Sequence, residues 1–428
     1  MIEALINAFR APDIRRRILF VLGILVVYRL LAQVPLPGVD HAQLKAFFEK
    51  NSAFGIIDLF AGGGLSQLSV VGLAMNPYIN ASIIMQLMTG VIPSLQALSR
   101  EGEYGRQRLN QYTRYLTVPM ALLQSFGILS ALGNQSPPVI IGGFGLGNPM
   151  SWVQMISMTA GAVLLMWLGE LITEKGIGNG ISFIIFAGIV SRAPAGLAGL
   201  FGQPNLRDIV LLVVLAIAAV FVIIYIQEGQ RRIPIQYASR VRGRRMYQGG
   251  QTFLPLRVNL AGVIPIIFAI SILQFPAQLA VYFSFSSVQI VKDVAQGIAG
   301  LLNSQTYQYA ILYFLLTVGF TYFYTAFTFK PDETAEQLRK NGGFIPGIRP
   351  GRPTQDYLAR VVSRITIAGA LFLGIVAVAP VLAGVLDPSL KGLAIGGTGV
   401  LIVVSVVVET MKQIEAQLMM RNYEGFIR

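Results

Sequence analysis

Cysteine is absent from the chain, and histidine occurs only once. The absence of cysteine excludes disulfides and thiolate metal sites. The single histidine, His41, rules out Cys/His zinc sites and any nucleophile that needs a buried histidine as its base. His41 lies in a polar stretch, so we expect it to be a solvated loop residue. These absences remove most catalytic and metal chemistry.

Charged residues are also scarce. They make up 12% of the 428 residues, against about 25% in soluble domains. Hydrophobic residues make up 54%, and the mean hydropathy is +0.63. This composition predicts a polytopic membrane protein. The net charge is +13, and in a membrane protein such an excess usually lies on the cytoplasmic side.

Acidic residues are missing from the centres of the long apolar runs. All eight aspartates lie in loops or in the interrupted segment described below, and Glu170 and Glu409 lie at the ends of runs. An ion-coupled transporter usually places ionisable groups or broken-helix polar sites near the membrane midplane. An intramembrane aspartyl protease would need paired acids there. Neither class is favoured, although an ion-coupled solute transporter of inverted-repeat architecture remains the alternative.

Ten apolar runs along the chain predict ten transmembrane helices. The fifth is the shortest, because Arg192 and Pro194 interrupt it. The first is a retained span and not a cleavable signal, since no small-residue cleavage site follows it. The runs cover approximately residues 18–34, 69–88, 115–132, 151–171, 177–192, 207–227, 259–281, 307–329, 361–385 and 393–411.

The distribution of Lys and Arg predicts the orientation. With ten spans, both termini lie on one side, and the segments on that side hold 26 of the 33 Lys and Arg residues. The opposite loops hold 6, and Arg29 lies inside the first span. Cytoplasmic loops carry the excess of Lys and Arg, so both termini are expected in the cytoplasm.

The spans divide into an N-terminal half at 1–192 and a C-terminal half at 207–411, joined by an external hinge at 193–206. Residues 412–428 form a cytoplasmic tail. Five spans in each half give the halves opposite orientations, which predicts an inverted repeat with the functional site between them. This expectation comes from counting spans.

The stretch from Phe54 to Leu65 is apolar but too short to cross a bilayer, since a spanning helix needs about 20 residues. Gly62, Gly63 and Gly64 interrupt it before the second span begins.

Two cytoplasmic loops are unusually large. Residues 228–259 contain two extended stretches with an alternating residue pattern on either side of a basic, turn-like tip. This pattern predicts an irregular hairpin. Residues of about 330–360 end in a proline-stiffened turn that presents Arg349.

Several motifs occur in an order that is typical of one family. They include "NPYINASIIMQL", "MWLGELITEKGIGNGISFIIFAGIV", "GQRRIPIQYA", "LPLRVNLAGVIPIIFA" and "FKPDETAEQLRKNGGFIPGIRPG". Together they resemble the bacterial SecY protein-translocation channels over about residues 18–425. The resemblance implies an all-α membrane protein whose two five-helix halves surround a central hourglass pore, with a short re-entrant plug helix. It implies a protein-conducting channel without catalytic residues or a cofactor.

The resemblance assigns roles to individual residues. The pore ring is expected at Met75, Ile79, Ile181, Ile185, Ile267 and Ile402, where methionine replaces the usual isoleucine at the first position. The plug is expected to contain Phe54, Ile56, Ile57, Leu59 and Phe60, with Gly62, Gly63 and Gly64 as its hinge. The lateral gate lies between spans two and three and spans seven and eight, with candidate residues Asn80, Ser82, Gln86, Gln274 and Phe275. The docking surface is expected at Arg244, Arg245 and Arg349.

The same resemblance implies partners and a location. The channel would work in the bacterial plasma membrane with small SecE and SecG subunits. The basic loops would bind the ribosome, through its rRNA, and the motor ATPase SecA. Its transient ligands would be signal peptides and nascent chains, and it would release apolar spans into membrane lipids.

Overall fold

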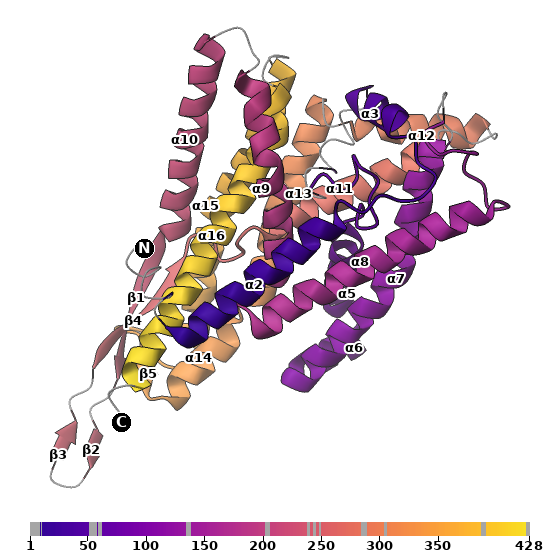
Figure 1. Ribbon diagram of the computed structural model, residues 1–428. Coiled ribbons are helices and arrows are strands. Elements are labelled where there is room, and N and C mark those ends of the chain that lie inside the picture. Colours follow the sequence, from indigo (N-terminus) through magenta and orange to yellow (C-terminus); the bar gives the residue numbers. More distant parts are fainter. Residues whose placement is uncertain are drawn as a thin grey trace.

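A computed structural model of the chain describes residues 9, 11–50, 58, 62–133, 138–201, 206–237, 240–242, 245–247, 250–283, 289–303, 306–386 and 391–424. The architecture is mostly helical (Figure 1). Its longer helices are α2 Pro12–Leu31, α5 Asn76–Val91, α7 Glu103–Gly133, α8 Pro149–Lys175, α9 Gly180–Phe201, α10 Leu206–Glu228, α11 Ile264–Phe283, α13 Tyr307–Thr328, α15 Arg352–Leu386 and α16 Lys391–Glu424. Its shorter helices are α3 His41–Lys50, α6 Pro93–Arg100, α12 Gln289–Leu301 and α14 Pro331–Lys340.

A helix lies at each of the ten expected spans, but by length and composition not all of these helices are long and apolar enough to cross a membrane. Among the described residues, four segments are long and apolar enough: Glu103–Gly133, Pro149–Lys175, Tyr307–Lys340 and Arg352–Ala379. The pair α5 and α6, bent by 99°, is long and apolar enough as one broken span. The molecule therefore has several membrane-length apolar helices, and the count of ten stays a prediction.

Several helix boundaries differ from the apolar runs. Helix α7 begins at Glu103, α15 begins at Arg352, and α16 continues to Glu424 through most of the expected tail at 412–428. The first helix begins at Pro12, whose fixed φ suits a first helical turn. The second expected span starts as a series of turns, and its helix begins only at Asn76, with Pro77 in the first turn. Ala74, two residues before Asn76, has a φ of 49°, which a right-handed helix does not allow. The fifth helix, α9, continues to Phe201, so much of the expected hinge at 193–206 is helical.

The all-α prediction is wrong for the first large loop, which forms β-structure. Strand β1, Gln230–Tyr237, pairs antiparallel with β4, Gln251–Arg257, so that Ile233 lies opposite Leu254. Strand β5, Gly343–Phe344, pairs with the other edge of β1. The short strands β2, Arg240–Arg242, and β3, Arg245–Tyr247, form the tip of the projection. The expected hairpin is confirmed, because alternating residues around a turn pair locally.

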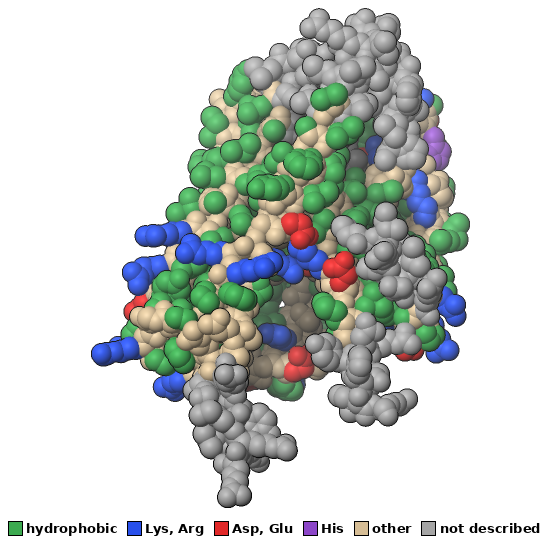
Figure 2. Space-filling view, turned by 90° about the vertical axis from the view of Figure 1, so that its left-hand side faces the viewer, with side chains coloured by type: hydrophobic (Ala, Val, Ile, Leu, Met, Phe, Trp, Pro, Cys, Tyr) green, Lys and Arg blue, Asp and Glu red, His purple; other side chains and the backbone are tan. Residues whose placement is uncertain are grey.

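The sheet, α14, the beginning of α2 and the later part of α16 lie at one end of the molecule (Figure 1). Ile233 and Leu256 of the sheet pack with Leu358 of α15 in a separate apolar cluster. Ile14 of α2 packs with Met411 of α16 in another. The beginning of the first helix and the later part of the last helix therefore meet at the same end as the sheet. On the face drawn in Figure 2, most Lys and Arg side chains lie below a broad zone of hydrophobic ones.

Helices α3 and α12 lie at the opposite end (Figure 1). Residue His41, the first residue of α3, is exposed, in agreement with the solvated position expected for it. Helix α12 is amphipathic: Ile290, Val294 and Ile298 follow one another at helical spacing and are all exposed. The largest apolar cluster lies between these two ends and contains residues from α2, α5, α8, α9, α10, α11, α13, α15 and α16.

Candidate functional site

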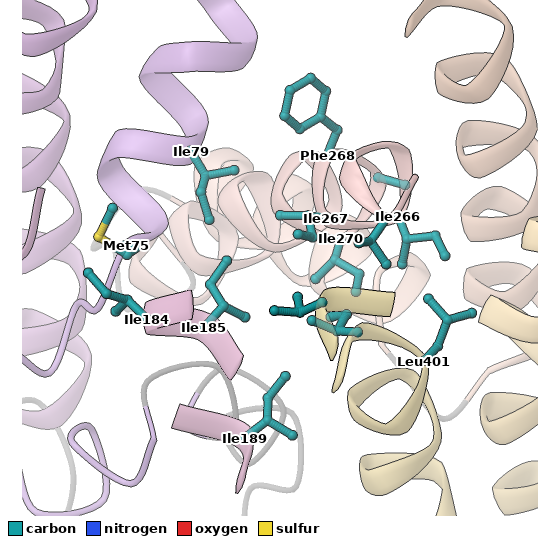
Figure 3. Close-up of a cluster of buried hydrophobic side chains, with 14 of the residues drawn as sticks. Met75, Ile79, Ile184, Ile185, Ile189, Ile266, Ile267, Phe268, Ile270 and Leu401 are labelled. Atoms are coloured by element: carbon teal, nitrogen blue, oxygen red, sulfur yellow. The ribbon is translucent and has the colours of Figure 1, made fainter. Parts of the chain in front are cut away.

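The expected pore-ring residues lie together at the centre of this largest cluster. Five of them are buried, namely Met75, Ile79, Ile185, Ile267 and Ile402, and Ile181 is partly buried against the same cluster. They come from the start of α5 and from α9, α11 and α16, which are far apart in the sequence. Figure 3 shows Ile79, Ile185 and Ile267 converging from three helices. The structure thus brings the six residues into one apolar cluster, at the place where the sequence predicts the constriction of a pore.

A cavity of about 10 Å³ lies at this convergence. That volume is at the lower limit for a single water molecule. Its lining is Met75, Asn76, Ile79, Ile185, Ile267, Ile270, Ser271 and Gln274. Among these described residues the side chains are aliphatic or neutral and polar, which leaves no fixed charge at the constriction.

Hydrogen bonds at the start of α9 set the position of this helix and therefore of Ile181 and Ile185. The side chain of Asn179 caps the helix, because its Oδ1 accepts from the amides of Ile181 at 3.0 Å and Ser182 at 3.3 Å. The Thr173 hydroxyl of α8 accepts from the Gly180 amide at 2.9 Å. A Cβ on Gly180 would collide with the Gly169 carbonyl, so glycine is required where α8 and α9 cross.

The structure describes only part of the expected plug. Phe54, Ile56, Ile57, Leu59 and Phe60 lie outside the described residues, whereas Asp58 and the hinge glycines are described. We call residues 62–66 the plug root. Gly62 has a φ of +62°, and a Cβ there would lie 2.6 Å from the Tyr28 hydroxyl and 2.7 Å from the Gly188 Cα. The plug root therefore packs directly against α2 and α9.

Charged side chains hold the plug root against these two helices. Arg29 of α2 donates to the Gly62 carbonyl at 2.7 Å. Arg192 of α9 forms an ion pair with the fully buried carboxylate of Asp58 and donates to the Ser66 hydroxyl at 2.7 Å. The Ser66 amide donates to Asp58 Oδ1, also at 2.7 Å. We call Arg29, Asp58, Ser66 and Arg192 the plug-root cluster.

Burial raises the pKa of the Asp58 carboxyl, while the Arg192 guanidinium and the hydrogen bonds from Ser66 act in the opposite direction. Sequence reasoning assigned no role to Asp58, Arg29 or Arg192. The available signal was their isolation: Asp58 is an acid within an apolar stretch, and Arg29 is a base within an apolar run. In a membrane protein, such isolated charges usually have a partner.

The lateral-gate candidates lie on two helices that pack against each other. Asn80, Ser82 and Gln86 are on α5, and Gln274 and Phe275 are on α11, which contacts both α5 and α7. Gln274 lines the same cavity as Ile79 and Ile267, so a candidate gate residue and candidate ring residues lie side by side there. Sequence reasoning missed Asn76 and Ser271, which line the same cavity. Helical spacing could have indicated them, since Ser271 follows Ile267 by four residues.

The docking candidates lie at the end of the molecule that carries the sheet. Arg349 is exposed in the turn between β5 and α15, where its carbonyl accepts from the Thr354 hydroxyl at 2.9 Å. The backbone of Arg245 begins β3 at the tip of the projecting hairpin. Arg244 lies outside the described residues.

Comparison with known proteins shows the family. The SecY family model matches residues 69–411. The chain belongs to the SecY family. It is 46% identical to the protein translocase subunit SecY of Corynebacterium glutamicum and 44% identical to that of Streptomyces coelicolor, with full coverage of both chains in each case. The SecY subunit of Mycobacterium tuberculosis is 43% identical, again over both full lengths.

Solved structures show the same fold at low sequence identity. A protein-conducting channel matches with a TM-score of 0.62 and 18% identity, covering 93% of this chain and 91% of that one. Sec61 in a canine ribosome–channel complex matches with a TM-score of 0.60 and 19% identity, covering the same shares. SecY proteins form a family of translocation channels and not of enzymes, which confirms the function expected from the sequence. The solute-transporter alternative is not favoured.

Proposed function

We propose that this chain is the pore-forming subunit of a bacterial plasma-membrane translocon, with ten spans in two inverted five-helix halves and both termini in the cytoplasm. It passes unfolded secretory polypeptides through the aliphatic constriction. The observation that carries this proposal is the convergence of Met75, Ile79, Ile185, Ile267 and Ile402 around a cavity of about 10 Å³. A hydrophobic constriction blocks ions by dewetting and holds no charge that would trap a passing chain.

The gate explains how apolar segments leave the channel. Helices α5 and α7 face α11 across a contact that contains neutral polar side chains, including Gln274. A partly polar helix interface can separate without exposing a continuous apolar seam. We assign sideways release of transmembrane segments into lipid to this contact.

The sheet and the following turn form the docking surface for partners. The end that carries them also carries the packed ends of α2 and α16, and the excess of Lys and Arg supports a cytoplasmic location for it. Arg349 and the hairpin tip project there. Arginine pairs with phosphates and with carboxylates in a bidentate manner, so it suits both rRNA and an acidic protein surface. The proposed partners are the ribosome, the motor ATPase SecA and the small subunits SecE and SecG.

Reconstitution tests the proposal. The chain, co-expressed with SecE and SecG subunits and placed in vesicles, should translocate an unfolded secretory substrate when SecA and ATP are added. Protease protection of the substrate measures the transport. A matched substrate without a signal sequence should stay outside the vesicles. Vesicles that instead accumulate small solutes, and never protect the secretory substrate, would favour a transporter.

A further inference from the structure

We propose that Arg192 is a positioning residue that keeps the plug in the closed channel by compensating the buried carboxylate of Asp58. This inference rests on the proposed plug function. The geometry is direct: Asp58 is fully buried, Arg192 pairs with it, and Arg192 also donates to Ser66 of the plug root. Arg29 supplies a second contact, because it donates a hydrogen bond to the Gly62 carbonyl.

The position of Arg192 connects the plug to the pore ring. Ile181, Ile185, Gly188 and Arg192 recur at spacings of three and four, so they lie along one face of α9. The first two contribute to the constriction, Gly188 touches the plug root, and Arg192 holds Asp58. One helix face therefore carries the seal of the pore and the anchor of the plug.

Both arginines belong to the N-terminal half. Arg29 is on α2 and Arg192 is on α9, whereas the gate opens between α5 and α11. Separating the gate helices does not by itself break the contacts of the plug-root cluster. The cluster therefore sets a barrier to ion leakage that is separate from the barrier to gate opening.

The energetics of a buried pair make a specific prediction. Desolvation largely cancels the attraction within such a pair, so replacing both partners by neutral groups has little effect. Removal of the arginine alone leaves an uncompensated buried charge, which is strongly unfavourable. Arg192→Met should therefore displace the plug, Asp58→Asn should have a small effect, and the double variant should behave almost like the wild type.

Two measurements on the full-length channel in lipid distinguish these cases. The first is the resting ion conductance in planar bilayers, which should rise about tenfold or more in Arg192→Met. The second is labelling of Leu65→Cys by a membrane-impermeant maleimide. Leu65 is buried in the plug root and the chain has no native cysteine, so this thiol is the only target. It should react faster in the Arg192→Met background.

An independent arm uses pH. Arg192, Arg29 and Tyr28 are the charged or titratable groups that face Asp58. Without Arg192, the largest influence that lowers the pKa of Asp58 is lost, while burial, which raises the pKa, and the hydrogen bonds from Ser66 remain. Protonation then removes the uncompensated charge, so the leak of Arg192→Met should decrease as the outer pH falls from about 7 to about 5. The double variant should not show this decrease.

A matched control distinguishes the specific loss of the Arg192–Asp58 ion pair from a general disturbance of the fold. Arg114 of α7 forms an ion pair with Glu170 of α8 at 2.8 Å, and both side chains are partly exposed. Arg114→Met removes the same charge and should leave conductance and labelling unchanged. Wild-type conductance in Arg192→Met, or a double variant that leaks as much as Arg192→Met, would overturn the proposal. Translocation of a secretory substrate in the same wild-type preparation shows whether the channel function itself stands.

Discussion

Ile79 of α5 and Gln274 of α11 line the same cavity of about 10 Å³. The first is a candidate ring residue and the second is a candidate gate residue. Because they share one cavity, moving α11 away from α5 at the gate must also open one side of the constriction. Pore opening and lateral opening are therefore mechanically connected at this point, while the plug root is anchored elsewhere.

The first prediction concerns Gln274→Leu. Leucine has a similar size and replaces an amide at the gate by an apolar group, which should favour the closed contact by about 1–3 kcal/mol. We expect a substrate with a weakened signal sequence to be secreted several-fold less, while a strong signal still opens the channel. Translocation of the two substrates into vesicles gives the comparison. Gln107→Leu, at an exposed position of α7, is the matched control, and equal losses for both substrates would argue against a gate role.

The second prediction concerns Ile402→Asn. This residue is fully buried in the central cluster, so an amide there favours wetting of the closed constriction. A cost of about 1–3 kcal/mol to the closed state shifts the ratio of closed to open populations by about fivefold to about 150-fold. Substrates with defective signals should now be secreted. Ile402→Leu keeps the apolar character and should preserve selectivity, and unchanged selectivity in Ile402→Asn would remove this residue from the ring.

Local patterns in the sequence predicted much of the site. Ile181 and Ile185, four residues apart, define one helix face, and the family motifs single them out from other aliphatic residues. The hairpin of β1 and β4 was predictable because alternation and turn residues act over a few positions. The beginning of α5 was not predictable, because an apolar run of this kind is compatible with a series of turns as well as with a helix. Only the structure shows turns before Asn76.

The plug-root cluster was not predictable from the sequence, for a different reason. Asp58 and Arg192 are far apart in the chain, and their pairing depends on how α9 packs against the plug root. Periodicity and composition report which face of one element is apolar. They do not report which distant charge meets a buried acid. The same limit applies to the cavity, which three helices form together, although helical spacing does place Ser271 on the same face as Ile267.

The third prediction concerns Gly62→Ala. The added methyl group would lie 2.6 Å from the Tyr28 hydroxyl and 2.7 Å from the Gly188 backbone, so the plug root must move. We expect a higher resting conductance in planar bilayers with translocation retained. Gly143→Ala is the matched control, because Gly143 also has a positive φ of 72° but has open space around it. A leak of the same size in both variants would assign the effect to backbone strain and not to the contact with α2 and α9.

The fourth prediction separates docking from simple charge anchoring, and it concerns Arg349→Glu. This residue is exposed in the turn after β5. The remaining cytoplasmic bases still greatly outnumber those outside, so orientation should survive the change. Charges at an interface act mainly on association rate and register. SecA-driven translocation should therefore fall sharply while expression stays normal. Arg360→Glu, on α15, makes the same change of charge away from the turn and should have little effect.

Reversing the charge of the two arginines at the hairpin tip should have a different effect from Arg349→Glu. Arg244→Glu combined with Arg245→Glu should mainly weaken ribosome binding, because rRNA phosphates are the expected target, and the loss should depend on salt. Co-sedimentation with ribosomes over a salt series measures it, and protease accessibility of the loops measures orientation in all variants. Inverted orientation would support anchoring as the role of these residues. Normal orientation together with normal translocation and ribosome binding would contradict docking, since reversed charges on a true docking surface must weaken at least one partner.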